Sequence, residues 1–360
     1  MPHHPSVVSS YQHPVPFFHN MTSKISKFAA VLVLLLSLIC SSATAKSKSS
    51  SGGKTQKLKV GYYAKTCPYA EIIVRQAVEK AVSKNPGIAA GLIRMHFHDC
   101  FVRGCDGSVL LDSVPGKPAA EKASPINFPS LRGFEVIDEA KALIEAKCPG
   151  TVSCADILAF AARDSALKVG WIGYDVPSGR RDGRVSLSTE VVQNLPPPFF
   201  TASQLRDNFK RKGLSLDEMV TLSGAHSVGV SHCSSFSNRL SGFNATFNQD
   251  PSLDPGFAAF LKTRCPAPGS SNSDPVVNND VLTPNQLDNK YYVNLKNHKG
   301  VLTSDQTLFD SPLTSKLVVN NAKYGSVWAK KFAAAMVHMG SIDVLTGNKG
   351  EIRRNCRVVN

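Results

Sequence analysis

The densest set of residues that could do chemistry lies in residues 94–108. On a helix, Arg94 and His98 lie four positions apart and share one face, whereas His96 points elsewhere. A fixed cation beside a titratable base suits the cleavage of a polar bond, because one group takes up a proton while the other stabilises negative charge. An ordinary surface pair has the same spacing, but the acidic residues that follow directly favour a functional site.

The end of the same stretch supplies oxygen ligands for a hard cation. Carboxylates, a hydroxyl and backbone carbonyls fall on one tight loop, which a disulfide between Cys100 and Cys105 could close. Calcium prefers such oxygen ligands. The pattern is not that of an EF-hand, and a solvated turn is the simpler alternative. The residues concerned are Asp99, Val102, Gly104, Asp106 and Ser108.

A second candidate region, residues 222–229, contains a single histidine. His226 stands among small residues, which would let another group approach the backbone closely. A lone histidine is more often a satisfied core residue than a ligand, so this segment alone leaves both interpretations open.

Composition narrows the class of protein. The chain has 360 residues, 42% hydrophobic and 19% charged, which is typical of a globular protein. Its formal net charge of +14 favours anionic surroundings such as nucleic acid or acidic polysaccharide. The basic residues are scattered and no basic stripe is interleaved with aromatics, so we expect no nucleic-acid partner.

The N-terminal region resembles a secretory signal. Lys24 and Lys27 precede an apolar run at residues 28–40, and Ala43 and Ala45 provide a small-residue cleavage site. The run is too short to span a bilayer, so we expect secretion and no membrane anchor. The expected organisation is a gene-model extension at residues 1–20, a signal peptide at 21–45, a flexible Ser, Gly and Lys tail at 46–57, and one domain at 58–360.

Cysteine usage agrees with secretion. Cys40 leaves with the signal, and eight cysteines remain. An even number in an exported protein indicates disulfides, although the sequence itself does not select their pairing. Zinc binding is the alternative, but no pair of CxxC motifs is present.

Helical signals dominate the domain. Apolar stripes and capping residues predict helices around residues 74–82, 88–99, 153–162, 201–212, 215–224, 288–295 and 323–339. Strand signals are short, around residues 175–177 and 186–187. We therefore expect a mainly α, loop-rich, disulfide-linked protein without internal repeats.

Taken in order, these motifs resemble the secretory class III plant peroxidases. Residues 94–108 resemble the distal-haem signature of that family, and residues 222–229 resemble its proximal-haem signature. The resemblance extends from about Leu58 to the C-terminus through shorter motifs at residues 152–156, 179–182, 194–196, 288–292 and 352–356. It implies a mainly α haem peroxidase fold, with two helical halves sandwiching the haem, minor β-hairpins and four disulfides.

The resemblance implies one b-type haem per chain, held between two histidines. His226 would be its axial ligand, and Asp305 would accept the other ring proton of that histidine. On the opposite face, His98 would take a proton from hydrogen peroxide and return it to the leaving oxygen. Arg94 would stabilise the developing negative charge, and Asn127 would hold the His98 ring.

Two calcium sites and a disulfide pairing follow from the same resemblance. The distal site would use the loop oxygens named above, with Glu121 reaching the ion through water. The proximal site would use Ser227, Asp280, Thr283 and Asp288, where Ser227 replaces a commoner threonine. The implied disulfides are Cys67–Cys148, Cys100–Cys105, Cys154–Cys356 and Cys233–Cys265, which use all eight cysteines.

The resemblance also assigns residues around the haem and reveals departures from the family pattern. Phe97 would lie in the haem pocket, and Pro196 would line the exposed haem edge where aromatic donors dock. Tyr174, Arg103 and Asn279 differ from what many relatives carry at these positions. None removes a catalytic group, so we expect activity, with donor preference and redox tuning open to change.

The function implied is that of a secreted, monomeric peroxidase. It would reduce hydrogen peroxide to water while phenolic donors lose one electron each in two steps, in lignification, wall cross-linking or the response to oxidative stress. Asn244 begins a glycosylation sequon and is expected to carry a glycan. One alternative is a calcium-loaded protein that binds acidic wall polysaccharide without turnover. The other, a cysteine or zinc hydrolase, would need Cys100 free of its disulfide.

Overall fold

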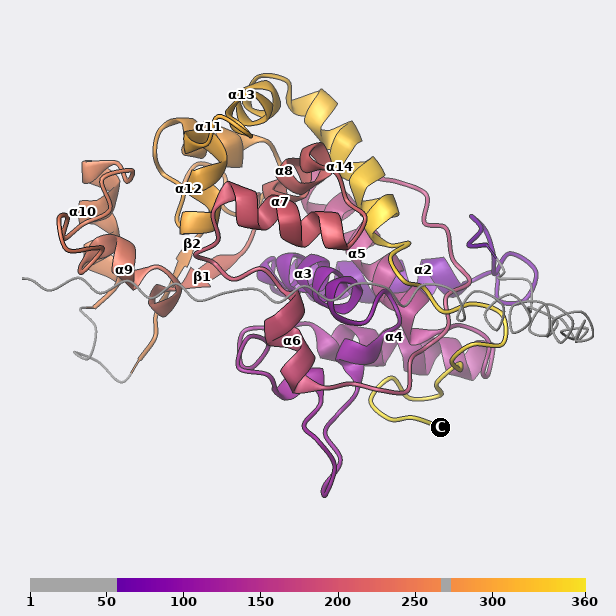
Figure 1. Cartoon of the computed structure of the whole chain (residues 1–360). Coiled ribbons are helices and arrows are strands. Elements are labelled where there is room, and N and C mark those ends of the chain that lie inside the picture. The colour runs from indigo at the N-terminus through magenta and orange to yellow at the C-terminus, as the bar shows by residue number, and fades with distance from the viewer. Residues whose placement is uncertain (1–56, 267–272) are drawn as a thin grey trace, which may run out of the picture. The chain divides into compact units, whose positions relative to one another are not determined.

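The computed structural model describes residues 57–266 and 273–360, which are mainly helical (Figure 1). The predicted extension, signal peptide and nearly all of the flexible tail lie outside the described residues. The α-helices are α2 (Ala70–Lys84), α3 (Gly87–Val102), α4 (Phe134–Lys147), α5 (Cys154–Gly170), α6 (Ser188–Asn194), α7 (Ala202–Arg211), α8 (Leu216–Ser223), α9 (Ser237–Leu240), α10 (Pro255–Arg264), α11 (Lys290–Lys296), α12 (Thr303–Asp310), α13 (Ser315–Lys323) and α14 (Gly325–Met339). Short 3₁₀ segments are η1 (Ser108–Leu110), η2 (Glu121–Ala123), η3 (Gly224–Ser227) and η4 (Cys233–Ser235), and the strands are β1 (Val230–His232) and β2 (Val276–Asn278).

Helix α3 lies between two hydrophobic clusters and is buried on nearly every side. Leu92 and Met95 pack into a cluster formed mainly by α2, α4 and α5. Ile93 and Phe101 pack into a second cluster formed largely by α8 and α11 to α14. Because a helix that is apolar all round must be enclosed, its few polar side chains, such as His98, are carried into the interior. Figure 1 shows α3 near the centre, with α7 and α8 on one side of it and α4 on the other.

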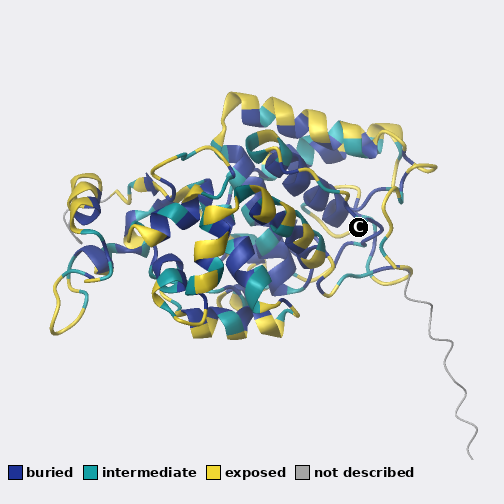
Figure 2. Cartoon of the chain, turned by 90° about the horizontal axis from the view of Figure 1, so that it is seen from above, coloured by how far each residue is buried: buried dark blue, intermediate teal, exposed yellow. Residues whose placement is uncertain are grey.

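The outer helices bury one face each, as the colouring in Figure 2 shows. α2, for example, buries an apolar stripe that includes Val74, Val78 and Val82, as the sequence predicts. No helix within the described ranges combines the length and the apolar character that a bilayer crossing requires.

Local capping signals set several helix starts. Thr201 and Ser215 each form a capping box with the residue three positions on, which confirms the predicted starts of α7 and α8. At α5 only half of the expected box forms. Ser153 accepts a hydrogen bond from the Asp156 backbone N–H at 3.1 Å, but the Asp156 carboxylate binds Arg180 at 2.6 Å instead of the cap.

Other boundaries differ from the sequence prediction. α11 begins at Lys290, two residues later than predicted. The helix expected over residues 323–339 forms as α14, which begins at Gly325 because α13 ends at Lys323. The strands expected at residues 175–177 and 186–187 do not form. The first of these segments is followed only by an isolated bridge between Lys59 and Ser178, because a strand requires a partner alongside that local sequence does not specify.

The two-stranded sheet lies where no strand is predicted. β1 and β2 pair antiparallel, with Ser231 opposite Val277. α9 and α10 lie between them in the sequence, so the sheet is not a hairpin, contrary to expectation. Phe236 and Leu261 belong to a small third cluster beside it. The sheet follows directly after the segment that carries His226.

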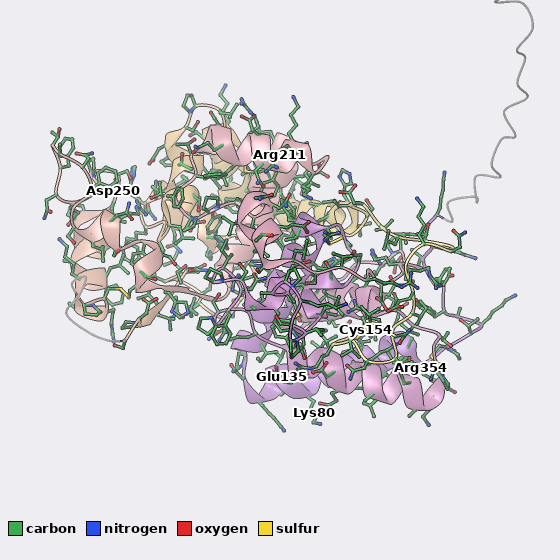
Figure 3. All side chains as sticks on the ribbon, turned by 60° about the horizontal axis from the view of Figure 1, so that its bottom comes forward. Lys80, Glu135, Cys154, Arg211, Asp250 and Arg354 are labelled. Carbon is green, nitrogen blue, oxygen red and sulfur yellow. A yellow bond between two sulfur atoms is a disulfide. The ribbon has the colours of Figure 1, made fainter. Side chains whose placement is uncertain are left out.

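Four disulfides join the described residues in the pairs that the resemblance implies. Cys67–Cys148 links the segment before α2 to the end of α4, Cys100–Cys105 closes the loop after α3, and Cys233–Cys265 links η4 to the end of α10. Cys154, at the start of α5, bonds to Cys356 in the C-terminal segment near Arg354 (Figure 3). Every cysteine between residues 57 and 360 that the structure describes is therefore used in a disulfide, and Cys100 has no thiol of the kind that a cysteine hydrolase would need.

Candidate active site

Arg94 is held as a cation on α3 by the loop that follows η2. Its Nη1 donates to Ser130 Oγ at 3.0 Å, and its Nη2 donates to the carbonyl oxygen of Ile126 at 3.1 Å. Burial, followed by the nearby charge of Arg132, lowers the pKa of Arg94 to about 10. The guanidinium therefore stays protonated at neutral pH, one helical turn from His98.

His98 is held as a neutral base. Asn127 Nδ2 donates to the carbonyl oxygen of Glu121 at 2.8 Å, which turns Asn127 Oδ1 toward His98 Nδ1, 2.6 Å away. An amide oxygen only accepts hydrogen bonds, so Nδ1 carries the ring proton and Nε2 keeps its lone pair. Burial and then the charge of Arg94 lower the pKa of His98 well below its ordinary value, while the bond to Asn127 raises it. The ring is neutral at neutral pH.

Phe97 lies beside this pair. Its ring centroid is 5.6 Å from that of His98, 4.3 Å from Phe101 and 6.2 Å from Phe209 on α7. Phe97 is only half-buried, although its aromatic neighbours are core residues. Its predicted place at the wall of the haem pocket is compatible with this geometry.

His226 lies on η3, directly after α8, and is fixed by a buried carboxylate. Its Nδ1 is 2.7 Å from Asp305 Oδ1 on α12, and Tyr291 Oη also donates to that oxygen at 2.9 Å. Burial lowers the pKa of His226, but the charge and hydrogen bond of Asp305 outweigh it, so the pKa is raised overall. The structure brings together His226 and Asp305, which are 79 positions apart and which the family resemblance pairs.

The two histidine-bearing segments face the same space. Arg94 is close enough to His226 for its charge to lower the pKa of that ring. The His226 side chain is 41% exposed, although its neighbours Leu222 and Ser227 are buried. With Nδ1 held by a carboxylate, Nε2 is the nitrogen left to ligate a metal. These residues fit a flat, iron-bearing group held between the segments, such as haem.

The loop after α3 and the η2 segment gather buried acidic and hydroxyl groups, some of whose oxygens lack hydrogen-bond donors. Asp99 is fully buried and accepts from the backbone N–H of Gly107 at 2.9 Å. Ser108 Oγ and both carboxylate oxygens of Glu121 are buried without a hydrogen-bond partner. Burial raises the pKa of Glu121 to about 8. The charge of Asp106 also raises this pKa, whereas Ser108 lowers it. Burial and the charge of Asp106 also raise the pKa of Asp99.

A cation would relieve this repulsion between buried carboxylates, so the residues fit the predicted distal calcium site. Gly104 has φ +96°, and a Cβ there would lie 2.6 Å from the backbone oxygen of Asp343, so glycine is required. The carbonyl of Val102, a predicted ligand, also accepts from Lys212 Nζ at 3.2 Å. A carbonyl has two lone pairs, so this bond leaves one free.

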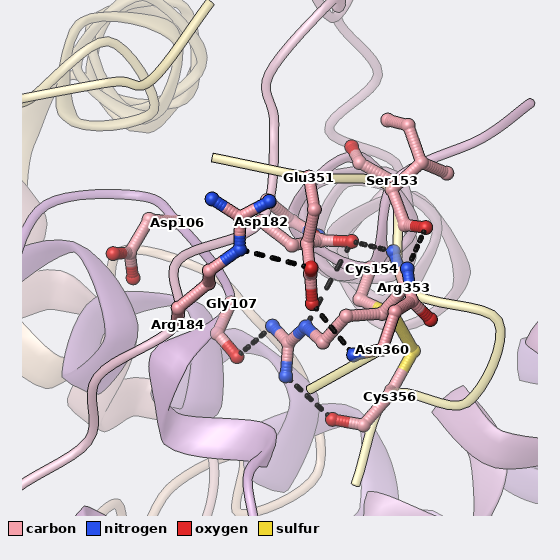
Figure 4. A network of polar contacts seen from close by, with 12 residues as sticks. Asp106, Gly107, Ser153, Cys154, Asp182, Arg184, Glu351, Arg353, Cys356 and Asn360 are labelled. Atoms are coloured by element: carbon pink, nitrogen blue, oxygen red, sulfur yellow. Dashed lines mark hydrogen bonds and ion pairs between the residues drawn. A yellow bond between two sulfur atoms is a disulfide. The ribbon is translucent and has the colours of Figure 1, made fainter. Parts of the chain in front are cut away.

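The buried side chain of Arg353 holds the backbone of this loop at Gly107 (Figure 4). Arg353 Nη2 donates to the carbonyl oxygen of Gly107 at 2.5 Å, and its Nη1 donates to the carbonyl of Cys356 at 2.6 Å. Asp182 accepts from the backbone N–H of Arg353 and of Ala155, both at 2.9 Å. Neither Arg353 nor Asp182 is among the predicted site residues, although both fall within the short motifs at residues 352–356 and 179–182.

The residues predicted for the proximal cation also converge. Thr283 Oγ1 lies 3.3 Å from Asp280 Oδ2 and 3.0 Å from Asp288 Oδ2. Ser227 Oγ accepts from the backbone N–H of Asp288 at 3.1 Å. Burial raises the pKa of Asp288. Hydroxyl and carboxylate oxygens of these four residues thus lie close together, and Ser227 directly follows His226. Such a donor set suits calcium.

Three further predicted positions lie at the surface or in satisfied contacts. Pro196 follows α6 and is half-buried. Asn244 is exposed, and its side-chain oxygen accepts from the backbone N–H of Thr246 at 2.9 Å, within a turn. Asn279 is buried, and its Oδ1 accepts from Ser231 Oγ at 2.7 Å, so this departure from the family pattern is satisfied locally.

A helical fold that presents a histidine and an arginine opposite a carboxylate-bound histidine belongs to the class of haem peroxidases. A family model described as Peroxidase matches residues 74–324. The chain is 58% identical over 304 residues to Peroxidase 5 of Vitis vinifera, covering 84% of this chain and 92% of that protein. It is 49% identical over 342 residues to Peroxidase 2 of Zea mays, covering 94% and 97% respectively. The chain belongs to the plant peroxidase family of class III.

Family membership settles the general activity. The protein is a haem peroxidase that acts on hydrogen peroxide, and the family uses haem and calcium as cofactors. Two features of the site escaped the sequence analysis: the hydroxyl of Tyr291 on Asp305, and the Arg353 support of the distal loop. The signal for both was their position inside a motif of the resemblance. Their partners lie in other motifs or segments, 14 positions away for Tyr291 and 246 for Arg353.

Proposed function

We propose that this chain is a secreted, monomeric peroxidase that reduces one hydrogen peroxide to two waters while two phenolic donors each lose one electron and one proton. The observation that carries the proposal is the state of His98. Its Nδ1 is bound by Asn127 and its pKa lies well below the ordinary value, beside the cationic Arg94 and opposite His226. A binding protein without turnover would have no need of a base and a cation in this arrangement.

His98 and Arg94 divide the work on peroxide. His98 Nε2 takes the proton of one peroxide oxygen and delivers it to the other oxygen, which departs as water when the O–O bond breaks. Arg94 donates hydrogen bonds to the departing oxygen while it carries negative charge. A haem held between His98 and His226 would supply the two-electron redox chemistry of this cleavage, and the phenolic donors would return the electrons one at a time.

The remaining assignments concern what holds these groups. We propose one haem per chain, with His226 Nε2 as its iron ligand and Asp305 making that imidazole more electron-rich. We propose two calcium ions per chain. One is held at the distal loop by Asp99, Val102, Gly104, Asp106 and Ser108, with Glu121 acting through water, and the other by Ser227, Asp280, Thr283 and Asp288.

The visible absorption spectrum of the purified protein tests the proposal most directly. One equivalent of hydrogen peroxide should lower and shift the Soret band, and a phenol should restore it. A Soret band that does not respond to peroxide would contradict the roles of His98 and Arg94. Absence of a Soret band after folding with haem and calcium would favour a binding protein.

Secretion and surface chemistry form part of the same proposal. The predicted signal at residues 21–45 would direct export, and the exposed Asn244 would then be glycosylated. The excess of basic residues would hold the enzyme near acidic wall polysaccharide, where phenolic donors would meet it at the segment around Pro196. A mass that does not change on glycosidase treatment would contradict the glycan at Asn244.

A further inference from the structure

One ion pair ties the distal loop to helix α6. Arg103 Nε lies 2.6 Å from Glu190 Oε2, and Arg103 Nη2 donates to Glu190 Oε1 at 2.6 Å. Arg103 directly follows the last residue of α3, and Glu190 lies inside α6. The Nη2 contact is a hydrogen bond, whereas Nε and Oε2 lie close without the geometry of one. The guanidinium thus contacts both carboxylate oxygens, unlike the single contact that a lysine would make.

The position of Arg103 in the loop determines where two proposed ligand carbonyls lie. It stands between Val102 and Gly104, the two residues whose backbone carbonyls are proposed as cation ligands. On one side the loop presses against Asp343, because a Cβ on Gly104 would meet that backbone. On the other side the Arg103 side chain is fastened to Glu190. The position of both carbonyls therefore depends on where Arg103 is held.

The segment around Glu190 also contacts the other part of the distal site. Ser186 Oγ accepts from the backbone N–H of Glu121 at 2.9 Å, and the Ser188 N–H donates to the carbonyl of Ala119 at 2.8 Å. Residues 186–190 thus contact η2, which carries Glu121, while Glu190 holds the loop. A single segment connects the direct ligands and the residue proposed to act through water.

The charges of the pair act weakly on the site. Arg103 lowers the pKa of Glu121 and Glu190 raises it, so their effects oppose each other. Their side chains are 30% and 29% exposed and line an open cavity of about 490 Å³, where water screens their charges. The contribution of the pair is therefore mechanical more than electrostatic.

We propose that the Arg103–Glu190 ion pair is a tie that slows the loss of the cation from the distal loop, so that both are positioning residues for an ion that their side chains do not ligate. This inference rests on the proposed distal calcium site. Arg103 also accounts for one departure from the family pattern, since the asparagine frequent in relatives is too short to form the same bidentate contact.

The rate of calcium loss tests this tie without recourse to activity. The calcium-loaded, haem-bound protein is mixed with an excess of fluorescent chelator, and calcium release is followed in time. The distal phase is the one missing in Asp106→Asn and retained in Asp280→Asn. Arg103→Gln and Glu190→Gln should each accelerate that phase about three- to fivefold, which corresponds to the stabilisation that a partly exposed ion pair provides. The double variant should release calcium no faster than either single variant.

The sign of the Arg103→Gln effect separates a tie from a charge effect. Removing a positive charge near a cation removes Coulomb repulsion, which by itself would slow release of the cation. Acceleration therefore shows the loss of the tie. Arg103→Lys keeps the charge but loses the bidentate contact, and should also accelerate release. The matched control is Arg184→Gln, which removes a guanidinium lining the same cavity but paired with Glu351 at 3.0 Å. Its release rate should equal that of the wild type.

Two results would overturn the inference. Slower release in Arg103→Gln would make the effect electrostatic, and an unchanged rate in both single variants would remove the tie. If Asp106→Asn loses no release phase, the loop holds no cation, and the proposed distal site fails together with the inference. If that phase is lost but the Arg103 and Glu190 variants release at the wild-type rate, only the inference fails.

Discussion

At the scale of residues, the site depends on which nitrogen of each histidine is occupied. In His98 the occupied nitrogen faces Asn127, a neutral acceptor, so the ring remains neutral and its free nitrogen is a base. In His226 the occupied nitrogen faces Asp305, a carboxylate, which raises the pKa of the ring. The difference between an amide and a carboxylate partner supports the opposite tasks proposed for the two histidines.

Replacing His98 by alanine should abolish the base without removing the proposed iron ligand. We expect the rate of reaction with peroxide to fall about a hundred- to ten-thousandfold, while the Soret band shows that haem stays bound. Stopped-flow absorbance measures this rate. His338→Ala is the control, because His338 is exposed and bonds only to Glu218 at the surface. A rate preserved in His98→Ala would contradict the proposed mechanism.

The pH dependence of the same reaction follows from the lowered pKa of His98. Because the base is the neutral ring and its pKa lies well below 6.5, the rate should stay constant as pH falls through 6.5 and decline only at more acidic pH. Arg94→Gln removes a cation that lowers this pKa, so the acid limb should move upward toward the ordinary value. A limb that moves to lower pH in Arg94→Gln would contradict the assignment.

At the scale of elements, helix α3 and its loop combine two functions in one stretch of chain. The helix carries Arg94 and His98, and the loop that ends it contains the buried acids Asp99 and Asp106. Asp99 lies directly after His98, so any movement of the loop on loss of the proposed cation would reach the proposed base through one peptide unit. Stability of the loop and activity of the base are therefore coupled.

Calcium removal should make stability fall as pH rises. In the chelated protein the pKa of Glu121 lies near 8, above its ordinary value of 4.5, so between these values the folded state binds more protons than the unfolded chain. The contribution of Glu121 to the free energy of unfolding is then fully present below about pH 4.5 and is lost as the pH rises toward 8. The Tm of the chelated protein should fall over this range, and Glu121→Gln should lessen the slope. A Tm that rises with pH in the chelated protein would contradict this.

At the scale of the whole molecule, the C-terminal segment closes the structure onto its own active site. Arg353 is fully buried and reaches Gly107 in the distal loop, while Cys356 bonds to Cys154 at the start of α5. The loop is thus held by a segment that is 246 positions away in sequence. No local motif describes such a contact.

Arg353→Gln should destabilise the whole protein. It removes the cation that lies 3.8 Å from the buried Asp182 carboxylate and leaves the carbonyls of Gly107 and Cys356 without their side-chain donor. We therefore expect a loss of about 3–5 kcal/mol in the free energy of unfolding. Urea unfolding of the calcium-loaded protein measures this loss. Arg354→Gln is the control, because Arg354 is the next residue and its side chain is exposed (Figure 3). It should change the free energy of unfolding by less than about 0.5 kcal/mol. Equal stability of both variants would contradict the role of Arg353.

The sequence predicts what is local and misses what is distant. Helical spacing puts Arg94 and His98 on one face, and capping residues Thr201 and Ser215 mark two helix starts. The pairing of His226 with Asp305 came from the family resemblance alone, because 79 positions separate them. The strands at residues 175–177 and 186–187 were wrong because pairing depends on a neighbour brought by the fold. The Arg103–Glu190 pair was missed for the same reason.

The closure of the distal loop by Arg353 has a consequence for how the protein is made. During synthesis the loop emerges long before its support, since Gly107 and Arg353 are 246 positions apart. At roughly 5–20 residues per second, this interval lasts about 10–50 s. Until then the buried acids of the loop lack their backbone anchor, and Cys154 lacks its partner Cys356. A functional site therefore cannot mature on the nascent chain, and an interrupted translation product would lack peroxidase activity even with every catalytic residue already present.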